Sequence, residues 1–195
     1  MTDAEIIERF VAVFTGGEPL MVFRDSSLPK GVNVEDLEPL LVTPWDEDGC
    51  ALWRPTPIQL APEALDRLYE SIPGPLPPLY ERLIGSYYFG DVEVGSFRLL
   101  PNFPPALDGL VTAIKEDKVM YPVLAASGLL QFGRGPEYDY DPFCFDTKRR
   151  LPDGDCPIVR FDHEEILVDR RLGVATAVAD SFRQLVMREI NEGER

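Results

Sequence analysis

The sequence is poor in the residues on which metal-dependent and nucleophilic catalysis most often rely. Its 195 residues include one histidine, His163, and three cysteines, Cys50, Cys144 and Cys156. An odd number of cysteines with no C-x-x-C spacing argues against a disulfide framework and indicates reduced thiols in a cytoplasmic protein. A single imidazole also disfavours a catalytic zinc centre.

The short motifs that identify common enzyme classes are missing too. The sequence has no G-x-G-x-x-G, G-x-x-x-x-G-K-[ST], H-E-x-x-H or G-x-S-x-G pattern. Its nearest glycine-rich stretch, 133–136, falls between two predicted strands, where no helix N-terminus is available to hold a phosphate. We therefore predict a protein that is not an enzyme and needs no cofactor.

Long apolar runs are also lacking. The longest uncharged run, 119–133, contains Pro122 and Gly128 and is too short to cross a bilayer. The N-terminal residues MTDAEIIERF carry acids and lack the apolar centre of a signal peptide. These features predict no contact with a membrane.

Positive charge is scarce, since 19 lysines and arginines stand against 34 aspartates and glutamates, for a net charge of -15. Such a chain repels phosphate backbones, so we predict that it has no nucleic-acid partner. The same charge attracts basic proteins and speeds their encounter. Solubility alone is the simpler explanation of an acidic composition.

What the sequence does contain is a succession of short helices and strands. Thr2 and Glu5 form a capping box, and the helix that follows is predicted to stop at Gly16 and Gly17. Ser181 and Gln184 form a second capping box for a last helix. Further helices are predicted over 62–72, 77–84 and 104–114, and strands over 19–23, 51–55, 92–100, 119–123, 128–132, 143–146 and 157–161.

The order of these elements predicts an α+β fold. The later strands follow one another directly, and Leu151–Asp155 has the composition of a turn, so 143–161 is predicted to be a hairpin. We expect a single, mainly antiparallel sheet with flanking helices and a C-terminal helix. Residues 1–60 are predicted as an N-terminal helix and extension packed on the core, with a long connection over 26–48, and 61–195 as the main domain of one compact unit.

Carboxylates gather in two segments next to predicted strands, and we take them as candidate binding residues. They are Glu137, Asp139, Asp141, Asp162, Glu164 and Glu165. With His163, all of them except Glu137 have the chemistry to hold Mg²⁺ or Ca²⁺, which would make the chain a metal-dependent enzyme. Their spacing matches no known metal loop, so an acidic, solvated turn after a strand is preferred and no metal is predicted.

Two other constellations have ordinary structural explanations. A Cys–His pair would need Cys144 or Cys156 close to His163, but both cysteines lie in apolar strand patterns and are predicted to act as small hydrophobes. The alternating aromatic residues between 138 and 145 are predicted to be sheet core rather than a binding platform.

The order of segments from Leu76 to Phe182 resembles the SUKH superfamily, which includes a yeast cell-wall-synthesis regulator and many bacterial proteins. The matching parts are a short helix with an early Leu-Pro, a strand ending in Leu99-Leu100-Pro101, the stretch 132–135, the aromatic strand 140–146, the strand 157–163 and the entry to the last helix at 179–182. The sequence departs from the family at 85–89, where an Asn-Gly-Gly turn is usual, and over its first fifty or so residues. It is therefore similar to a divergent or extended member.

This resemblance implies one curved antiparallel sheet and a function in binding. Bacterial members often act as immunity proteins that bind and block a toxin domain, and the family has no catalytic residues to carry over. We therefore expect a non-catalytic protein-binding module whose partner is a protein, such as a basic nuclease toxin. The alternatives are the metal-dependent enzyme around His163 and a regulatory adaptor domain, and the oligomeric state stays open.

Overall fold

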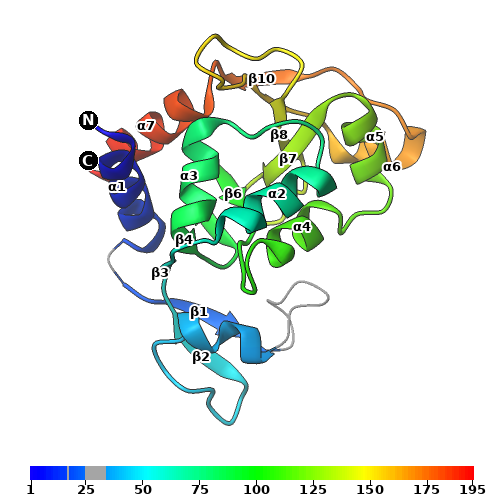
Figure 1. Ribbon diagram of the computed structural model, residues 1–195. Coiled ribbons are helices and arrows are strands. Elements are labelled where there is room, and N and C mark those ends of the chain that lie inside the picture. The colour runs from blue at the N-terminus through cyan, green and yellow to red at the C-terminus, as the bar shows by residue number, and fades with distance from the viewer. Residues whose placement is uncertain (17, 25–33) are drawn as a thin grey trace.

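A six-stranded antiparallel sheet forms the centre of the computed structural model, which describes residues 1–16, 18–24 and 34–195 (Figure 1). The strands lie in the order β10-β9-β8-β7-β6-β5, and helices flank the sheet. The predicted α+β class and the antiparallel sheet are confirmed. The strands are β5 (Val92–Val94), β6 (Phe97–Leu99), β7 (Leu129–Arg134), β8 (Pro142–Asp146), β9 (Ile158–Arg160) and β10 (Thr176–Ala179).

Three helices pack together on one side of this sheet. They are α1 (Asp3–Thr15), α3 (Pro78–Ser86) and α7 (Phe182–Gly193). The rings of Phe132 and Phe145 stack in the sheet at 4.2 Å, and the rings of Tyr80 and Phe182 meet Phe145 edge-on at 5.1 and 5.6 Å. These edge and stacked contacts form the centre of the main core.

Two shorter helices cover part of the other face. They are α5 (Met120–Ala126) and α6 (His163–Asp169), which pack with Cys144 and Val159 in a second apolar cluster. Their strand neighbours Phe145 and Ile158 belong to the main core, as expected because successive side chains in a strand point to opposite faces. Burial on both faces explains why β8 is apolar at nearly every position.

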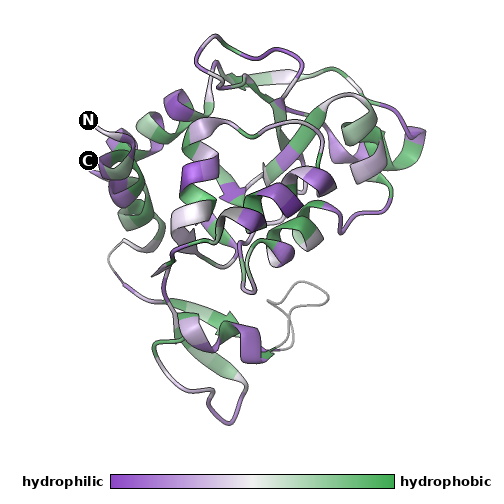
Figure 2. Ribbon diagram, viewed as in Figure 1, coloured by the Kyte–Doolittle hydropathy of each residue, from purple (hydrophilic) through white to green (hydrophobic). Residues whose placement is uncertain are grey.

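Smaller elements surround the main sheet. In the N-terminal part, β1 (Leu20–Phe23) pairs with β2 (Cys50–Trp53), both rich in hydrophobic residues (Figure 2), next to the 3-10 helix η1 (Val34–Leu40). The remaining elements are β3 (Thr56–Pro57), which pairs with β4 (Tyr87–Tyr88), and the helices α2 (Pro62–Ser71) and α4 (Asp108–Ile114). In the described residues, no helix is long and apolar enough to cross a bilayer.

The predicted helix caps are present. Thr2 and Glu5 form the capping box of α1, and Gly16 ends this helix with a φ of 54°. Ser181 Oγ accepts from the amide of Gln184 at the start of α7. Gly17 and residues 26–33 of the predicted connection lie outside the described part of the chain.

Two predicted strands are wrong. The segment 92–100 is a hairpin, β5–β6, that turns at Gly95 with a φ of 53°, where the apolar spacing changes from two to three residues. The segment 119–123 lies in α5, whose first amides at Val119 and Met120 donate to Asp117 Oδ1 at 2.7 Å. This cap outweighs the strand preference of the valines.

Other elements have no counterpart in the prediction. Residues 162–165, predicted as a solvated turn, open α6, and Asp162 Oδ1 accepts from the amides of Glu164 at 2.8 Å and Glu165 at 3.3 Å. The strands β3, β4 and β10 and the helix η1, which lies within the predicted connection, were also missed. These elements are short, so their periodic signal is weak.

Candidate functional site

The two acidic segments meet in the folded chain. Residues 135–141 form the loop between β7 and β8, and residues 162–165 form the start of α6. Asp141 Oδ1 accepts a hydrogen bond from the His163 amide at 2.9 Å and lies 2.8 Å from His163 Nδ1. We call the surface formed by 135–141 and 162–165 the loop–α6 surface.

Arg160 of β9 binds both aspartates of the loop. Its Nη2 donates to Asp139 Oδ2 and Asp141 Oδ2, both at 2.7 Å, and its Nε donates to Asp141 Oδ2 at 2.9 Å. Burial opposes the charge on Asp141, but hydrogen bonds from His163 and Arg160 outweigh it, so the pKa of Asp141 lies below its ordinary value. Asp139 and Asp141 therefore position the loop, and both carboxylates share the single charge of Arg160.

Further contacts fix the backbone of the loop. The amide of Glu137 donates to Glu93 Oε2 at 3.0 Å, and the amide of Gly135 donates to the carbonyl of Asp141 at 3.1 Å. A Cβ atom at Gly135 would lie 2.2 Å from Asp139 Cγ, so a side chain at 135 would push this carboxylate away from Arg160. The loop is held in one conformation by its own hydrogen bonds and by its neighbours.

Two tyrosines project from this loop. Tyr138 is 87% exposed and Tyr140 is 51% exposed, whereas Phe143 and Phe145 are buried. The prediction of sheet core is confirmed for the phenylalanines and wrong for the tyrosines, because Tyr138 and Tyr140 precede the start of β8 at Pro142 and lie in the loop. The ring of Tyr140 lies 5.6 Å from the Arg134 guanidinium and 5.9 Å from the His163 ring, so it is held on two sides.

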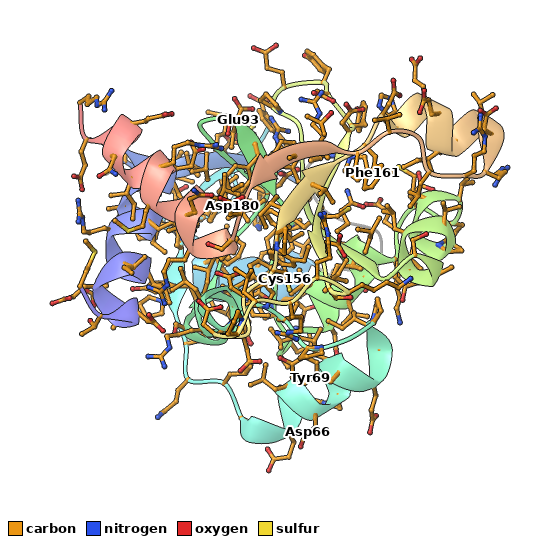
Figure 3. All side chains as sticks on the ribbon, turned by 90° about the horizontal axis from the view of Figure 1, so that it is seen from above. Asp66, Tyr69, Glu93, Cys156, Phe161 and Asp180 are labelled. Carbon is orange, nitrogen blue, oxygen red and sulfur yellow. The ribbon has the colours of Figure 1, made fainter. Side chains whose placement is uncertain are left out.

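The loop–α6 surface also carries exposed carboxylates. Glu137, Asp162, Glu164 and Glu165 are exposed. Asp162 also caps α6. Figure 3 shows Phe161, immediately before Asp162, and Glu93, which holds the loop, on the opposite side of the molecule from Asp66 of α2. The described residues thus combine exposed aromatic rings and exposed negative charge on one surface.

Three residues of the loop–α6 surface lie close enough together to hold a metal ion. One ligand atom from each of Asp139, Asp141 and His163 lies within 4.8 Å of the others. The Arg160 guanidinium binds both carboxylates, so a cation entering this group would have to compete with it. His163 contacts Asp141 and Tyr140, while Cys144 and Cys156 are buried, and burial raises the pKa of both thiols.

No family model and no curated protein matches this sequence. The chemistry of the loop–α6 surface itself must therefore carry the functional interpretation. Its distinctive features are the fixed loop, the exposed tyrosine rings and the exposed carboxylates of the loop and of the start of α6.

Proposed function

We propose that this chain is a non-catalytic protein-binding module that uses the loop–α6 surface to hold a basic partner protein. One observation carries the proposal, namely that Tyr138 is 87% exposed at the tip of a loop fixed by hydrogen bonds. Tyrosine is one of the residues that dominate the energy of protein interfaces. A loop held in one conformation loses little entropy on binding, which favours affinity.

The charges of the surface define the partner. Glu137, Asp162, Glu164 and Glu165 are exposed, on a chain of net charge -15. Complementary charge raises the association rate and excludes acidic competitors. A partner with a cationic groove, such as a nuclease that binds nucleic acid, would meet both the rings and the carboxylates.

The resemblance of the sequence to the SUKH superfamily supports a narrower version of this proposal. In that version the chain is a divergent member with an N-terminal extension and acts in the cytoplasm as an immunity protein that neutralises a basic toxin. A regulatory adaptor domain would use the same surface for a different target. The α+β fold with its antiparallel sheet is compatible with both versions.

The test is affinity purification with the full chain as bait, from source lysate and against the product of any toxin-like neighbouring gene. We expect a specific partner whose binding weakens with salt because the attraction is electrostatic. Tyr138→Ala should raise the dissociation constant about 30-fold, the equivalent of about 2 kcal/mol. Glu164→Gln should slow association and reduce its salt dependence.

Asp66→Asn is the matched control, because Asp66 is an exposed carboxylate on α2, on the opposite side from α6 (Figure 3). It should leave affinity and salt dependence close to those of the unchanged chain. A partner that binds Tyr138→Ala as tightly as the unchanged chain would refute the assignment of the surface. A toxin partner would favour the immunity role over the adaptor role.

The convergence of Asp139, Asp141 and His163 supports a second candidate, a metal-dependent enzyme. Calorimetric titration with Mn²⁺, Mg²⁺ and Ca²⁺ separates the two functions. Stoichiometric binding that Asp141→Asn abolishes and Arg160→Gln strengthens would favour the enzyme, because Arg160 competes for the same carboxylates. Absence of saturable binding in both the unchanged chain and Arg160→Gln would leave the binding module as the function.

A further inference from the structure

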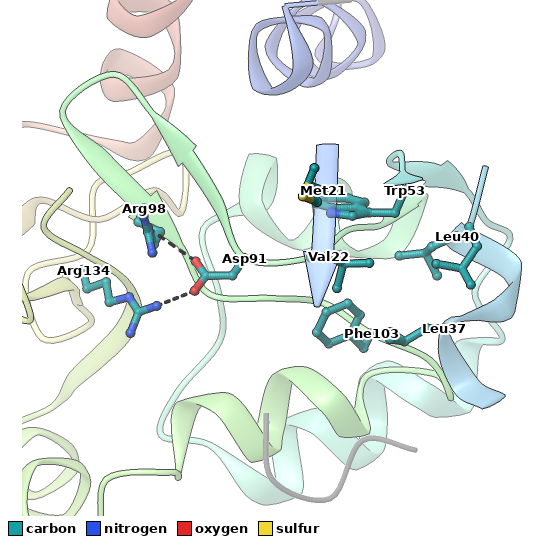
Figure 4. A pocket seen from close by; sticks show the side chains of 11 residues that line it. Met21, Val22, Leu37, Leu40, Trp53, Asp91, Arg98, Phe103 and Arg134 are labelled. Carbon is teal, nitrogen blue, oxygen red and sulfur yellow. Dashed lines mark hydrogen bonds and ion pairs between the residues drawn. The ribbon is translucent and has the colours of Figure 1, made fainter. Parts of the chain in front are cut away.

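A cavity of about 260 Å³ lies between the N-terminal elements β1, β2 and η1 and the strands β5 to β7 of the main sheet. It has an apolar end and a charged end (Figure 4). The apolar side chains come from several separate segments and are Met21, Val22, Leu37, Leu40, Trp53 and Phe103. The charged side chains are Asp91, Arg98 and Arg134.

The apolar wall includes an aromatic ring held flat against the backbone. A Cβ atom at Gly90 would lie 2.8 Å from Trp53 Cζ2, so only glycine allows the indole to lie this close. Trp53 is 5% exposed and Phe103 is 3% exposed, which shows that both rings are fixed by packing. The apolar end is therefore a preformed surface for a flat or slender apolar group.

The charged end has more hydrogen-bond donors than acceptors. Arg134 Nη2 donates to Asp91 Oδ2, and Arg98 Nε lies 3.8 Å from Asp91 Oδ1, beyond hydrogen-bond distance. Among the described residues, Arg98 Nε, Arg134 Nε and Asp91 Oδ1 find no hydrogen-bond partner, although each atom is buried. Two guanidiniums together offer about ten N–H donors, which is more than the roughly four acceptor sites of one carboxylate can take.

Burying these polar atoms without partners costs free energy unless a bound group supplies the missing hydrogen bonds. Buried polar groups are normally hydrogen-bonded, and partly buried charges are normally paired. Glu93 Oε2 takes one hydrogen bond from Arg98 Nη2 at 3.0 Å, but Glu93 does not line the cavity. Among the lining residues, two guanidiniums face one carboxylate, so the lining carries one net positive charge, which Glu93 offsets only from outside the cavity.

We propose that this cavity binds a small amphipathic anion, a carboxylate whose aromatic or short aliphatic body lies against Trp53 and Phe103 and whose charged head accepts from Arg98 and Arg134. The volume lies just below the range of about 300–1,000 Å³ that suits drug-sized ligands, so the ligand is metabolite-sized. The cavity adjoins the loop–α6 surface, because the Arg134 guanidinium also contacts the Tyr140 ring, but its ligand is distinct from the protein partner proposed there.

The test compares an acid with its neutral amide on the unchanged chain. Calorimetry with 4-phenylbutyrate should give saturable binding with a dissociation constant at least tenfold below that of 4-phenylbutyramide, which has the same shape without the charge. A Trp45→Phe variant leaves Trp53 as the single tryptophan, because the chain has two. The fluorescence of Trp53 should then change with ligand concentration and give the same dissociation constant as calorimetry.

A double variant tests the charged end without leaving an unpaired charge. Glu93→Gln combined with Arg98→Gln removes both members of one ion pair and leaves Arg134 facing Asp91 one to one, so it should cancel the preference for the acid. Arg171→Gln is the control, because Arg171 is 75% exposed and pairs with Asp169 outside the cavity. Lack of saturable binding by the acid, equal affinity for acid and amide, or an unchanged preference in the double variant would each overturn the proposal.

Discussion

Asp155 offers the sharpest test of how the fold is held together. Its carboxylate is 4% exposed and accepts backbone hydrogen bonds from Cys156 at 2.8 Å, Phe182 at 3.0 Å and Arg183 at 3.1 Å. Ser181 Oγ caps the next amide, that of Gln184, at 3.0 Å. One buried side chain therefore joins the turn between β8 and β9 to the first turn of α7.

We expect Asp155→Ala to lower the free energy of unfolding by about 2–6 kcal/mol, because it leaves the buried amides of Cys156 and Phe182 without acceptors at about 1–3 kcal/mol each. The Arg183 amide is partly buried, and water can replace its lost partner. Asp155→Asn keeps one acceptor oxygen but loses the charge and the second acceptor, so its loss should be about 1–3 kcal/mol.

Urea unfolding followed by circular dichroism measures these differences. Asp66→Ala, at an exposed position on α2, should change the free energy by less than about 0.5 kcal/mol and controls for the loss of a carboxylate. If Asp155→Ala cost no more than Asp66→Ala, the claim that Asp155 connects the turn to α7 would be wrong.

Two further predictions concern the β5–β6 turn and the loop–α6 surface. Gly95→Ala should cost about 1–3 kcal/mol in urea unfolding from backbone strain alone, and more from the clash, because a Cβ atom there would lie 2.0 Å from the buried Glu189 Oε2. Gly16→Ala, with a similar positive φ but open space, isolates the strain, and equal losses would refute the clash. The lowered pKa of Asp141 means that its stabilisation is complete above the ordinary value of 3.8 and is lost as pH falls through the lower folded value. The unfolding free energies of the unchanged chain and Asp141→Asn should therefore converge as pH is lowered below about 4, and a constant difference would contradict this assignment.

Much of the fold could be predicted because its signals are local. Capping residues marked the starts of α1 and α7, and the turn Leu151–Asp155 marked the β8–β9 hairpin. The prediction of a strand at 119–123 failed because its valines favour a strand, whereas Asp117 Oδ1 accepts from the amides at the start of a helix there. The hairpin at Gly95 was missed because Gly95-Ser96 was not taken as a two-residue turn, although the apolar spacing changes from two to three residues there.

The candidate site was predictable in part. Both acidic segments were recognised, but their contact depends on Asp141 meeting the His163 amide across 22 positions of sequence, which no local pattern specifies. Asp139 and Asp141 differ from the other candidates only because Arg160 pairs with them. The exposure of Tyr138 was missed because Tyr138 and Tyr140 have the two-residue spacing of a strand, although β8 begins only at Pro142.

The cavity had no signal in the sequence. Its charged end joins Asp91 to arginines on two different strands, and its apolar end adds residues from the N-terminal elements. The Asp91–Arg134 contact spans 43 positions. Such a site follows from the pairing of β6 with β7, which sets Arg98 opposite Arg134.

The contact between α1 and α7 has a consequence for synthesis of the chain. Arg9 pairs with Glu194, 185 positions away, and the ring of Phe10 meets that of Phe182. At about 5–20 residues per second, the ribosome completes α7 on the order of ten seconds or more after α1. During this interval the apolar stripe of α1 has no α7 to pack against, so we expect the nascent chain to be a client of ribosome-associated chaperones.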